Sequence, residues 1–448
     1  MRHFRAPDGS YFILVSARGA GLVDWVVVTP AGPVVDPPGL PGLTQALAEA
    51  ALAGTGRDVS RDLTRELEAL ARLGQLEVAY SQMRAAKATI PAEVEAEVEA
   101  VRQATAALSD PLAWQRAVRA APAMGPNLHH LPHATLLHVR TTPDALPAVG
   151  RLLWEQREGG MLRGVSEAYR RVVASLAQQQ SSAPLGELRR EILALAYPGH
   201  PLARAWETPA EAPVPPDDAL AAYQRTQHPS QSCHVIVGDL KLKAAVAVLR
   251  EIFATSEIRL PPPDAPKLPP RSGVARESRL PPGGAVGVAV GYRMPAGTAP
   301  EAAEALARWL TPRLRTRLDK VGGDGTVTAP FPNHTADLLL VEAWPLQGSK
   351  SSAGRILGAA TTALNEAANQ GPTQGEFLAA MAATLTEAGR DRVGQAAFAV
   401  TLASRCGPNG RGFKRGYEPQ PIGLPTLRKL GREVLRPAGR IVVLRGKR

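Results

Sequence analysis

The sequence contains few cysteines and no long apolar run. Its two cysteines, Cys233 and Cys406, lie far apart, so they cannot form the disulfide framework of a small secreted domain or a zinc finger. No apolar run approaches the ~18–20 residues that cross a bilayer, which excludes a membrane-spanning helix. The first residues contain an Asp-Gly turn and do not resemble a secretory signal. We expect a cytoplasmic protein, or a periplasmic one if a signal was removed and the numbering restarted at an added Met.

Aromatic residues are also scarce, at 4% of 448 residues, although the net charge is +11. Residues 401–448 hold twelve Lys or Arg against two Glu, so almost all of the excess charge lies there. A basic chain suggests nucleic acid, but the aromatic side chains that stack on bases are missing. We therefore expect no nucleic-acid partner. A solvated basic face and a contact with an acidic partner surface both stay open.

The chain is long enough for two to four domains, and one plan occurs in it twice. The alternating patterns GLVDWVVVTPAG (21–32) and GAVGVAVGYRMPAG (284–297) are each followed by an alanine-rich helical stretch, 42–55 and 300–314. Each half ends with a helix, a proline turn and a β run, at 221–240 and 427–446. This repetition predicts two related α/β units.

The boundaries follow from composition. Residues 259–284 are rich in proline and polar residues, which predicts an extended linker. The first unit is therefore 1–258 and the second 285–448. A charge-patterned helical region at about 56–122, with leucines at helical spacing, is predicted to be an inserted helical pair within the first unit.

Short motifs along nearly the whole chain resemble the pitrilysin-like (insulinase, inverzincin) metallopeptidases. The family's Gly-Leu-x-His-x-x-Glu-His helix ending in Gly-Thr is matched by Gly42, Leu43, Gly54 and Thr55. Further matches are NLHHLPHATLLHV (127–139), MLRGVSEAYRRVVASL (161–176), HPSQSCHVIVGDL (228–240), and GYR.P and RLRTRL in the second half. The resemblance implies an α+β fold of two tandem homologous units. Each would be a mainly antiparallel sheet with helices packed on one side, together forming half of a clam-shaped chamber.

The zinc motif of that family is degenerate here. Gln45 and Glu49 stand where the family has its two zinc-binding histidines, and Ala48 stands where it has the catalytic Glu. No shift of alignment restores the motif, because no His lies between His3 and His129. The stretch Ala174–Leu176 also lacks the further acidic ligand. We predict no catalytic residue, no metal and no cofactor in this chain, since neutral imidazole is what binds such a zinc.

The family also has a substrate-contacting Arg and Tyr in its second half, and the direct alignment matches neither of them. In the matching stretch, RLDKVGGDGTVTAP (317–330), Asp319 replaces the Arg and Thr326 the Tyr. A shift of two residues places Arg317 in the Arg position, so Arg317 is kept as a candidate substrate-binding residue.

The histidines at 129, 130, 133 and 138 are a weak metal candidate, because Pro132 breaks any helix and TLLHVR is typical of a strand. In the family this region is an edge strand to which the peptide substrate adds itself. The resemblance therefore makes Asn127, Leu128 and His129 candidate peptide-binding residues. GGDG (322–325) predicts a turn rather than a phosphate loop, and Cys406 has no visible base that would make it a nucleophile.

The leading hypothesis is a non-catalytic, pseudo-peptidase subunit of a heterodimeric zinc metallopeptidase. It would shape the chamber and bind peptide, while a sister subunit with H-x-x-E-H would hold the zinc and perform hydrolysis. The alternative is a structural or scaffold subunit of a larger complex without a proteolytic role. An active peptidase with an unrelated site is disfavoured by the thin inventory of catalytic groups.

Overall fold

The computed structural model describes most of the chain. It covers residues 1–446 except 18, 20, 33, 55–59, 87, 111, 132, 161, 183–184, 205–213, 259, 262–266, 272, 331–337, 391–394, 405 and 407–421. Within the basic segment 401–448, residues 405, 407–421, 447 and 448 lie outside the described residues. Among the described helices, none is long and apolar enough to span a membrane.

The chain forms two compact units, and neither is a continuous stretch of sequence. The first contains Met1–Gln178, Thr208–Ala265 and Arg392–Lys414. The second contains Gln179–Glu207, Pro266–Asp391 and Arg415–Arg448. Each unit therefore includes a segment from the opposite half of the sequence.

The first unit is built on a six-stranded sheet with the order β1-β2-β6-β3-β5-β4. Its strands are β1 (Arg2–Arg5), β2 (Tyr11–Ser16), β3 (Val23–Pro30), β4 (Ala123–Leu131), β5 (Ala134–Thr141) and β6 (Cys233–Gly238). Only β2 and β6 pair in parallel; all other neighbours are antiparallel. The central strand β3 is buried along its whole length.

One face of this sheet is covered by α5 (Ala113–Ala120), α6 (Leu146–Gly159) and α10 (Leu242–Ile252). Their apolar side chains share a core with Phe12, Trp25 and Ile236 of the strands. Since side chains alternate along a strand, Asp24, Val26 and Val235 face the opposite side. That side is covered by α14 (Gln395–Ser404), which comes from the second half of the sequence and packs on β3, β5 and β6.

A disulfide joins Cys233, the first residue of β6, to Cys406, which follows α14. The two cysteines are separated by 173 residues, and neither their type nor their spacing indicated this single bond. The bond also removes Cys406 as a candidate nucleophile in this form of the chain.

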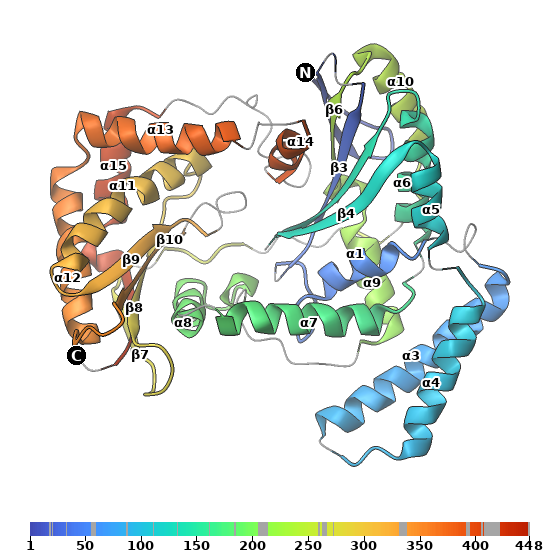
Figure 1. Ribbon diagram of the computed structural model, residues 1–448, viewed down its shortest axis with the longest axis horizontal. Helices are drawn as coiled ribbons and strands as arrows, with labels where there is room; N and C mark the ends of the chain where they lie inside the picture. Colours follow the sequence, from blue (N-terminus) through green and yellow to red (C-terminus); the bar gives the residue numbers. More distant parts are fainter. Residues whose placement is uncertain are drawn as a thin grey trace. The chain divides into compact units, whose positions relative to one another are not determined.

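Three more helices, α1 (Leu43–Ala51), α7 (Val165–Ser182) and α9 (Pro216–Thr226), pack together in a separate apolar cluster. The predicted insertion contains α3 (Leu63–Ala85) and α4 (Ala92–Ala107), an antiparallel pair that projects from the unit (Figure 1). The pair is attached at its base by the buried ion pair of Glu66 with Arg163, 2.5 Å long. Along its length, exposed pairs such as Arg72 with Glu97 link the two helices.

The second unit has a five-stranded sheet with the order β7-β11-β8-β10-β9. The strands are β7 (Arg276–Arg279), β8 (Gly287–Arg293), β9 (Gly323–Thr328), β10 (Leu338–Pro345) and β11 (Arg440–Arg445). The main core on one face is supplied by α11 (Pro300–Asp319), α12 (Ala353–Gln370), α13 (Gln374–Arg390) and α15 (Leu424–Val434). The opposite face carries α8 (Gly186–Ala196), which comes from the first half of the sequence.

The predicted α+β fold with two related units is confirmed. The order β7-β11-β8-β10-β9 repeats β2-β6-β3-β5-β4, with the one parallel pair at the same place. Each half contains a helix, a short 3₁₀ turn and a strand in succession, as the sequence pattern indicated. The turn begins at Pro229 in the first half and at Pro437 in the second. Two features differ from expectation: helices lie on both faces of each sheet, and β7 falls inside the segment 259–284 that we expected to be a linker.

Candidate functional site

Helix α1 carries the degenerate motif, and its start is fixed by polar contacts. The Asp36 carboxylate accepts hydrogen bonds from the backbone N–H groups of Gly42 (2.7 Å) and Thr44 (2.9 Å), which the first helical turn leaves unpaired. Gly42 has a positive φ of 85°, and a Cβ there would lie 2.9 Å from the Val172 side chain. Only glycine fits this position without displacing α7.

The three motif positions of α1 offer one amide, one carboxylate and one alanine, and both polar groups are already engaged in contacts. The Gln45 side chain is nearly buried and donates to the Leu131 carbonyl of β4 at 3.4 Å. Ala48 is buried and offers no donor atom. The Glu49 carboxylate lies 3.3 Å from Nε2 of His130 and 3.4 Å from an Arg171 guanidinium nitrogen.

This donor set does not fit zinc. A catalytic zinc of this type needs neutral imidazoles and an open position, whereas here one carboxylate is held by His130 and Arg171 and one amide by a backbone carbonyl. The described residues contain no group of three His, Cys, Asp or Glu that could hold a metal ion. That the chain binds no zinc stays a prediction.

Glu49 is also poorly suited to act as a base. Burial raises the pKa of its carboxyl, but the hydrogen bonds and positive charges of His130 and Arg171 lower it, and the net pKa lies below its ordinary value. A general base at neutral pH needs the opposite shift. Arg171 also pairs with Glu167 at 2.9 Å, which makes a chain of ion pairs on the surface of α7.

Strand β4 is the edge of the first sheet, because it pairs with β5 on one side and has no other partner in the described sheet. A register irregularity between Met124 and Asn127 interrupts the pairing, and Pro126 in that interval has no N–H group. The regular part of the edge is therefore 127–131. Asn127 and His129 are exposed and share one face by alternation, whereas Leu128 is half-buried.

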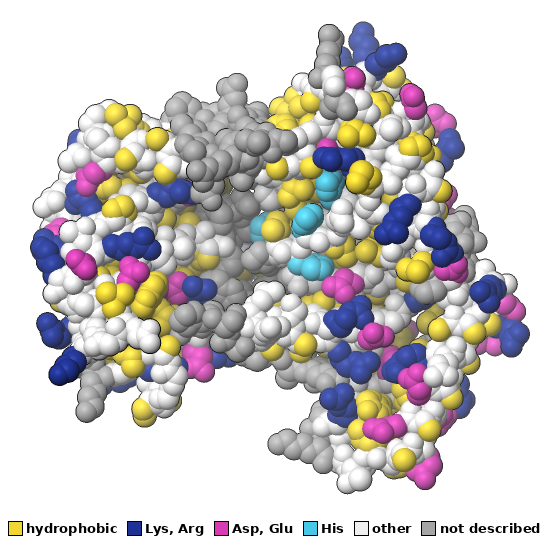
Figure 2. Space-filling view, in the orientation of Figure 1, with side chains coloured by type: hydrophobic (Ala, Val, Ile, Leu, Met, Phe, Trp, Pro, Cys, Tyr) yellow, Lys and Arg dark blue, Asp and Glu magenta, His cyan; other side chains and the backbone are white. Residues whose placement is uncertain are grey.

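Next to this edge lies a polar network on β3 and β5. The Asp24 carboxylate is fully buried and accepts hydrogen bonds from His138 (2.8 Å) and Arg140 (2.9 Å). It also accepts one from Gln395 of α14 at 2.9 Å. The rings of His129 and His138 have centroids 6.4 Å apart. Figure 2 shows histidine side chains gathered on one face of the first unit.

Two pKa values in this network are shifted. Burial raises the pKa of Asp24, but the hydrogen bonds and charges of His138 and Arg140 lower it, leaving a net decrease. Burial lowers the pKa of His129, and the neighbouring His138 and His130 lower it further. At neutral pH the Asp24 carboxylate is therefore charged, and His129 on the edge strand β4 is mostly neutral.

The candidate residue of the second unit, Arg317, lies in the last turn of α11 and forms an ion pair with Glu366 of α12. Its Nε donates to a Glu366 oxygen at 3.0 Å. Asp319 ends α11, and Thr326 lies on the edge strand β9. These contacts hold two helices together; a substrate role for Arg317 stays a prediction.

The sequence motifs located α1 and β4 but not the groups around them. Arg171, Asp24, Arg140 and Gln395 reach the site from four other elements, α7, β3, β5 and α14. Their only signal in the sequence is that Asp24 is charged in an otherwise apolar strand.

No protein-family model matches the chain, and no curated protein matches it at a significant level. Solved structures do match over the full length. A protease from Helicobacter pylori has 14% sequence identity and a TM-score of 0.68, with 100% of this chain and 99% of that chain covered. An inactive domain of an M16 peptidase from Pseudomonas fluorescens has 13% identity and a TM-score of 0.68, with 100% and 98% covered. Pitrilysin has 14% identity and a TM-score of 0.60, with 99% of this chain and 44% of pitrilysin covered.

At this level of identity the likeness establishes the fold. The chain has the fold of the pitrilysin-like, or M16, peptidases, as the sequence motifs indicated. Its activity and partners do not follow from the likeness.

Proposed function

We propose that this chain is the non-catalytic subunit of a two-component zinc metallopeptidase of the pitrilysin type. It binds peptide along β4, while a sister subunit that carries H-x-x-E-H holds the zinc and performs hydrolysis. The observation that carries the proposal is a regular edge strand, β4, beside a helix that has Gln45 and Glu49 at the zinc-ligand positions and Ala48 at the catalytic position.

The proposed binding step uses the main chain of β4. An extended peptide adds to 127–131 as a further strand, and its N–H and C=O groups pair with those that point away from β5. Alternate residues of an edge strand present these groups, so a short peptide segment makes only a few hydrogen bonds. Binding of this kind is weakly selective for sequence, and the exposed Asn127 and His129 supply the local side-chain contacts.

The sister subunit is supported by two facts. The chain matches only 44% of pitrilysin, so a single-chain relative has about twice its length. In addition, one matching structure of the same size as this chain is described as an inactive M16 domain. A non-catalytic chain of this fold needs a catalytic one for hydrolysis, and we propose that the two associate.

The sequence is compatible with a cytoplasmic and with a periplasmic location. The Cys233–Cys406 disulfide supports the periplasm, because structural disulfides persist in oxidising compartments and are rare in the cytoplasm.

The edge-binding step is tested with a fluorescent extended peptide and two N-methylated versions of it. N-methylation of every second residue removes the N–H groups on one side of the peptide strand. We expect methylation in one register to weaken binding at least about tenfold and methylation in the other register to have little effect. Asn127→Ala removes one side-chain contact and no main-chain group, so it should weaken binding less than methylation in the pairing register.

Equal weakening by both methylated peptides would contradict main-chain pairing at an edge. The absence of catalysis is tested separately on the purified chain by elemental analysis and a peptide-cleavage assay. We expect substoichiometric zinc and no cleavage. One tightly bound zinc per molecule would overturn the proposal.

A further inference from the structure

Helix α14 lies on a sheet to which it is remote in sequence, and it is attached there at both ends. At its first residue, Nε2 of Gln395 lies within hydrogen-bond distance of the carbonyls of Val237 (3.0 Å) and Leu22 (3.1 Å) and of the Asp24 carboxylate. Just after its last residue, Cys406 is bonded to Cys233.

The two attachments match the geometry of β6. Val237 lies near the end of β6 and Cys233 at its start, four residues apart, which is about 13 Å along a strand. From Gln395 to Cys406 there are eleven residue steps, or about 16 Å along a helix. Helix α14 therefore runs antiparallel to β6 and is attached near both ends of that strand.

The sheet face beneath the helix combines the Asp24 network at the start of the helix with apolar side chains. Val26, Leu136 and Val235 point to the α14 side by strand alternation, and each is fully buried. Ala399 and Ala403 of the helix are buried as well, so small side chains allow close packing on the sheet. Without α14 this face would be exposed apolar surface, in the unit that carries the β4 edge.

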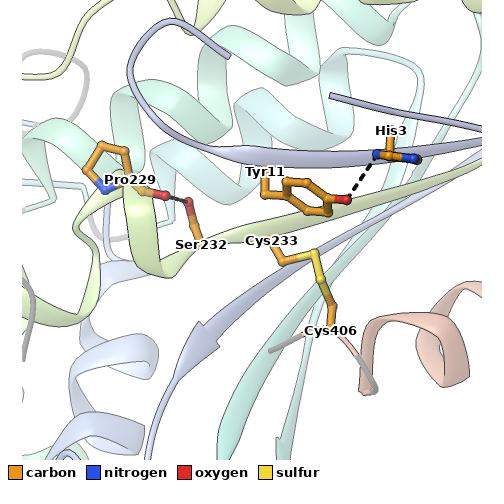
Figure 3. The surroundings of a disulfide bond; sticks show 6 residues. All are labelled: His3, Tyr11, Pro229, Ser232, Cys233 and Cys406. Carbon is orange, nitrogen blue, oxygen red and sulfur yellow. Dashed lines mark hydrogen bonds between the residues drawn. A yellow bond between two sulfur atoms is a disulfide. The ribbon is translucent and has the colours of Figure 1, made fainter. Parts of the chain in front are cut away.

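The two attachments differ in strength. The amide of Gln395 has two hydrogens for its three acceptors, and its bonds exchange readily with water. The disulfide is covalent, and its sulfur atoms belong to residues that are 1% and 6% exposed. Figure 3 shows Cys406 reaching from the end of the helix to the sulfur of Cys233 on the strand.

We propose that the Cys233–Cys406 disulfide is a redox-controlled lock that holds α14 on the face of the first sheet opposite α5, α6 and α10. The lock opens when a dithiol reductant transfers two electrons to it. One reductant thiolate attacks a cysteine sulfur and forms a mixed disulfide, and the second thiolate then displaces that cysteine. The products are two cysteine thiols and the cyclic disulfide of the reductant. Helix α14 is therefore attached to the sheet at both ends only under oxidising conditions.

The test is hydrogen–deuterium exchange on the full chain, read by mass spectrometry over Gln395–Ser404 and over β6. The probe is dithiothreitol, and the comparison variant is Cys233→Ser with Cys406→Ser. We expect the α14 amides to exchange at least about tenfold faster in the reduced wild type and in the double variant. Dithiothreitol has no further effect on the double variant, and α12 in the second unit keeps its exchange rate in all samples.

Two results would overturn the proposal. One is unchanged exchange of α14 after the bond is broken. The other is alkylation of two free thiols in chain that was refolded with oxidised glutathione. If the double variant does not fold, the reduced and alkylated wild type gives the same comparison, with α12 as the check on folding. This test uses no peptide and no sister subunit, so its outcome is independent of the proposed peptidase role.

Discussion

Both units cover the second face of their sheet with one helix, but they fix that helix with different chemistry. Each has a sheet with helices on one face, and each covers the opposite face with one helix from the other half of the sequence, α14 in the first unit and α8 in the second. In the first unit the helix is held by a disulfide and one amide side chain. In the second unit it is held by charged side chains.

Helix α8 is attached to its sheet mainly through arginine and glutamate. Arg189 binds the Glu342 carboxylate of β10 with two hydrogen bonds, 2.5 and 2.7 Å long, and Glu342 is 1% exposed. Arg445 of β11 pairs with Glu187 at the start of the helix. Close approach is possible because β8 has a glycine at position 291, where a Cβ would lie 2.9 Å from the Ile192 side chain.

The difference teaches that this fold requires a covered sheet face but does not prescribe the bond that fixes the cover. A disulfide makes the cover of the first unit sensitive to redox potential. An ion pair with a buried carboxylate, Glu342, makes the cover of the second unit sensitive to the loss of Arg189. Substitutions in each unit can separate the two modes.

The largest effect is expected from removal of the disulfide. Cys233→Ala with Cys406→Ala should lower the free energy of unfolding of the first unit by about 4 kcal/mol, because the bond closes a very long loop. The measurement is denaturant unfolding read by hydrogen exchange, with peptides from β3 for the first unit and β8 for the second. An equal loss in both units would mean that the bond does not act locally on the first unit.

The next effect concerns the ion pair of the second unit. Arg189→Ala leaves the Glu342 carboxylate buried without its guanidinium, which should cost about 3 kcal/mol in the same unfolding measurement at β8. The matched control is Arg271→Ala, since Arg271 pairs with Glu433 at 3.5 Å and both side chains are more than a third exposed. That control should cost less than ~0.5 kcal/mol. A similar cost for both variants would show that burial of the pair is unimportant.

The smallest effect is a pH dependence at the polar attachment of α14. Asp24→Asn removes the charge that Arg140 and His138 bind, which should cost about 2 kcal/mol at pH 7. Because the folded pKa of Asp24 lies below its ordinary value, its contribution is present above the unfolded pKa, about 4, and is lost as the pH falls through the folded pKa. The stability difference between wild type and variant should therefore shrink in acid. A constant difference from neutral to strongly acidic pH would show that this charge is not the cause.

Much of the fold could be predicted because its strands and helices follow from local sequence patterns. The alternation in GLVDWVVVTPAG and GAVGVAVGYRMPAG indicates β3 and β8, whose side chains are buried on both faces. The positions of Gln45, Ala48 and Glu49 follow from spacing within one helix. In both cases the information lies within a few residues of the chain.

What could not be predicted depends on contacts between remote segments. Periodicity shows that α14 and α8 have apolar sides but not which sheet they cover. Cys233 and Cys406 are 173 positions apart, and Asp24 and Gln395 are 371 positions apart. Neither residue type nor spacing identifies such pairs. The same reason explains why the ion pair of Arg317 with Glu366 was not anticipated.

The central claim, a non-catalytic subunit that acts with a catalytic sister, is tested most directly by purification of this chain from its native lysate. Bound proteins are identified by mass spectrometry and their stoichiometry is measured. The account predicts one roughly equimolar partner with the same fold and an intact H-x-x-E-H motif, and a pair that cleaves peptides which neither chain cleaves alone. Recovery of the chain by itself, or within a large assembly that lacks such a partner, would contradict the claim and favour a scaffold role.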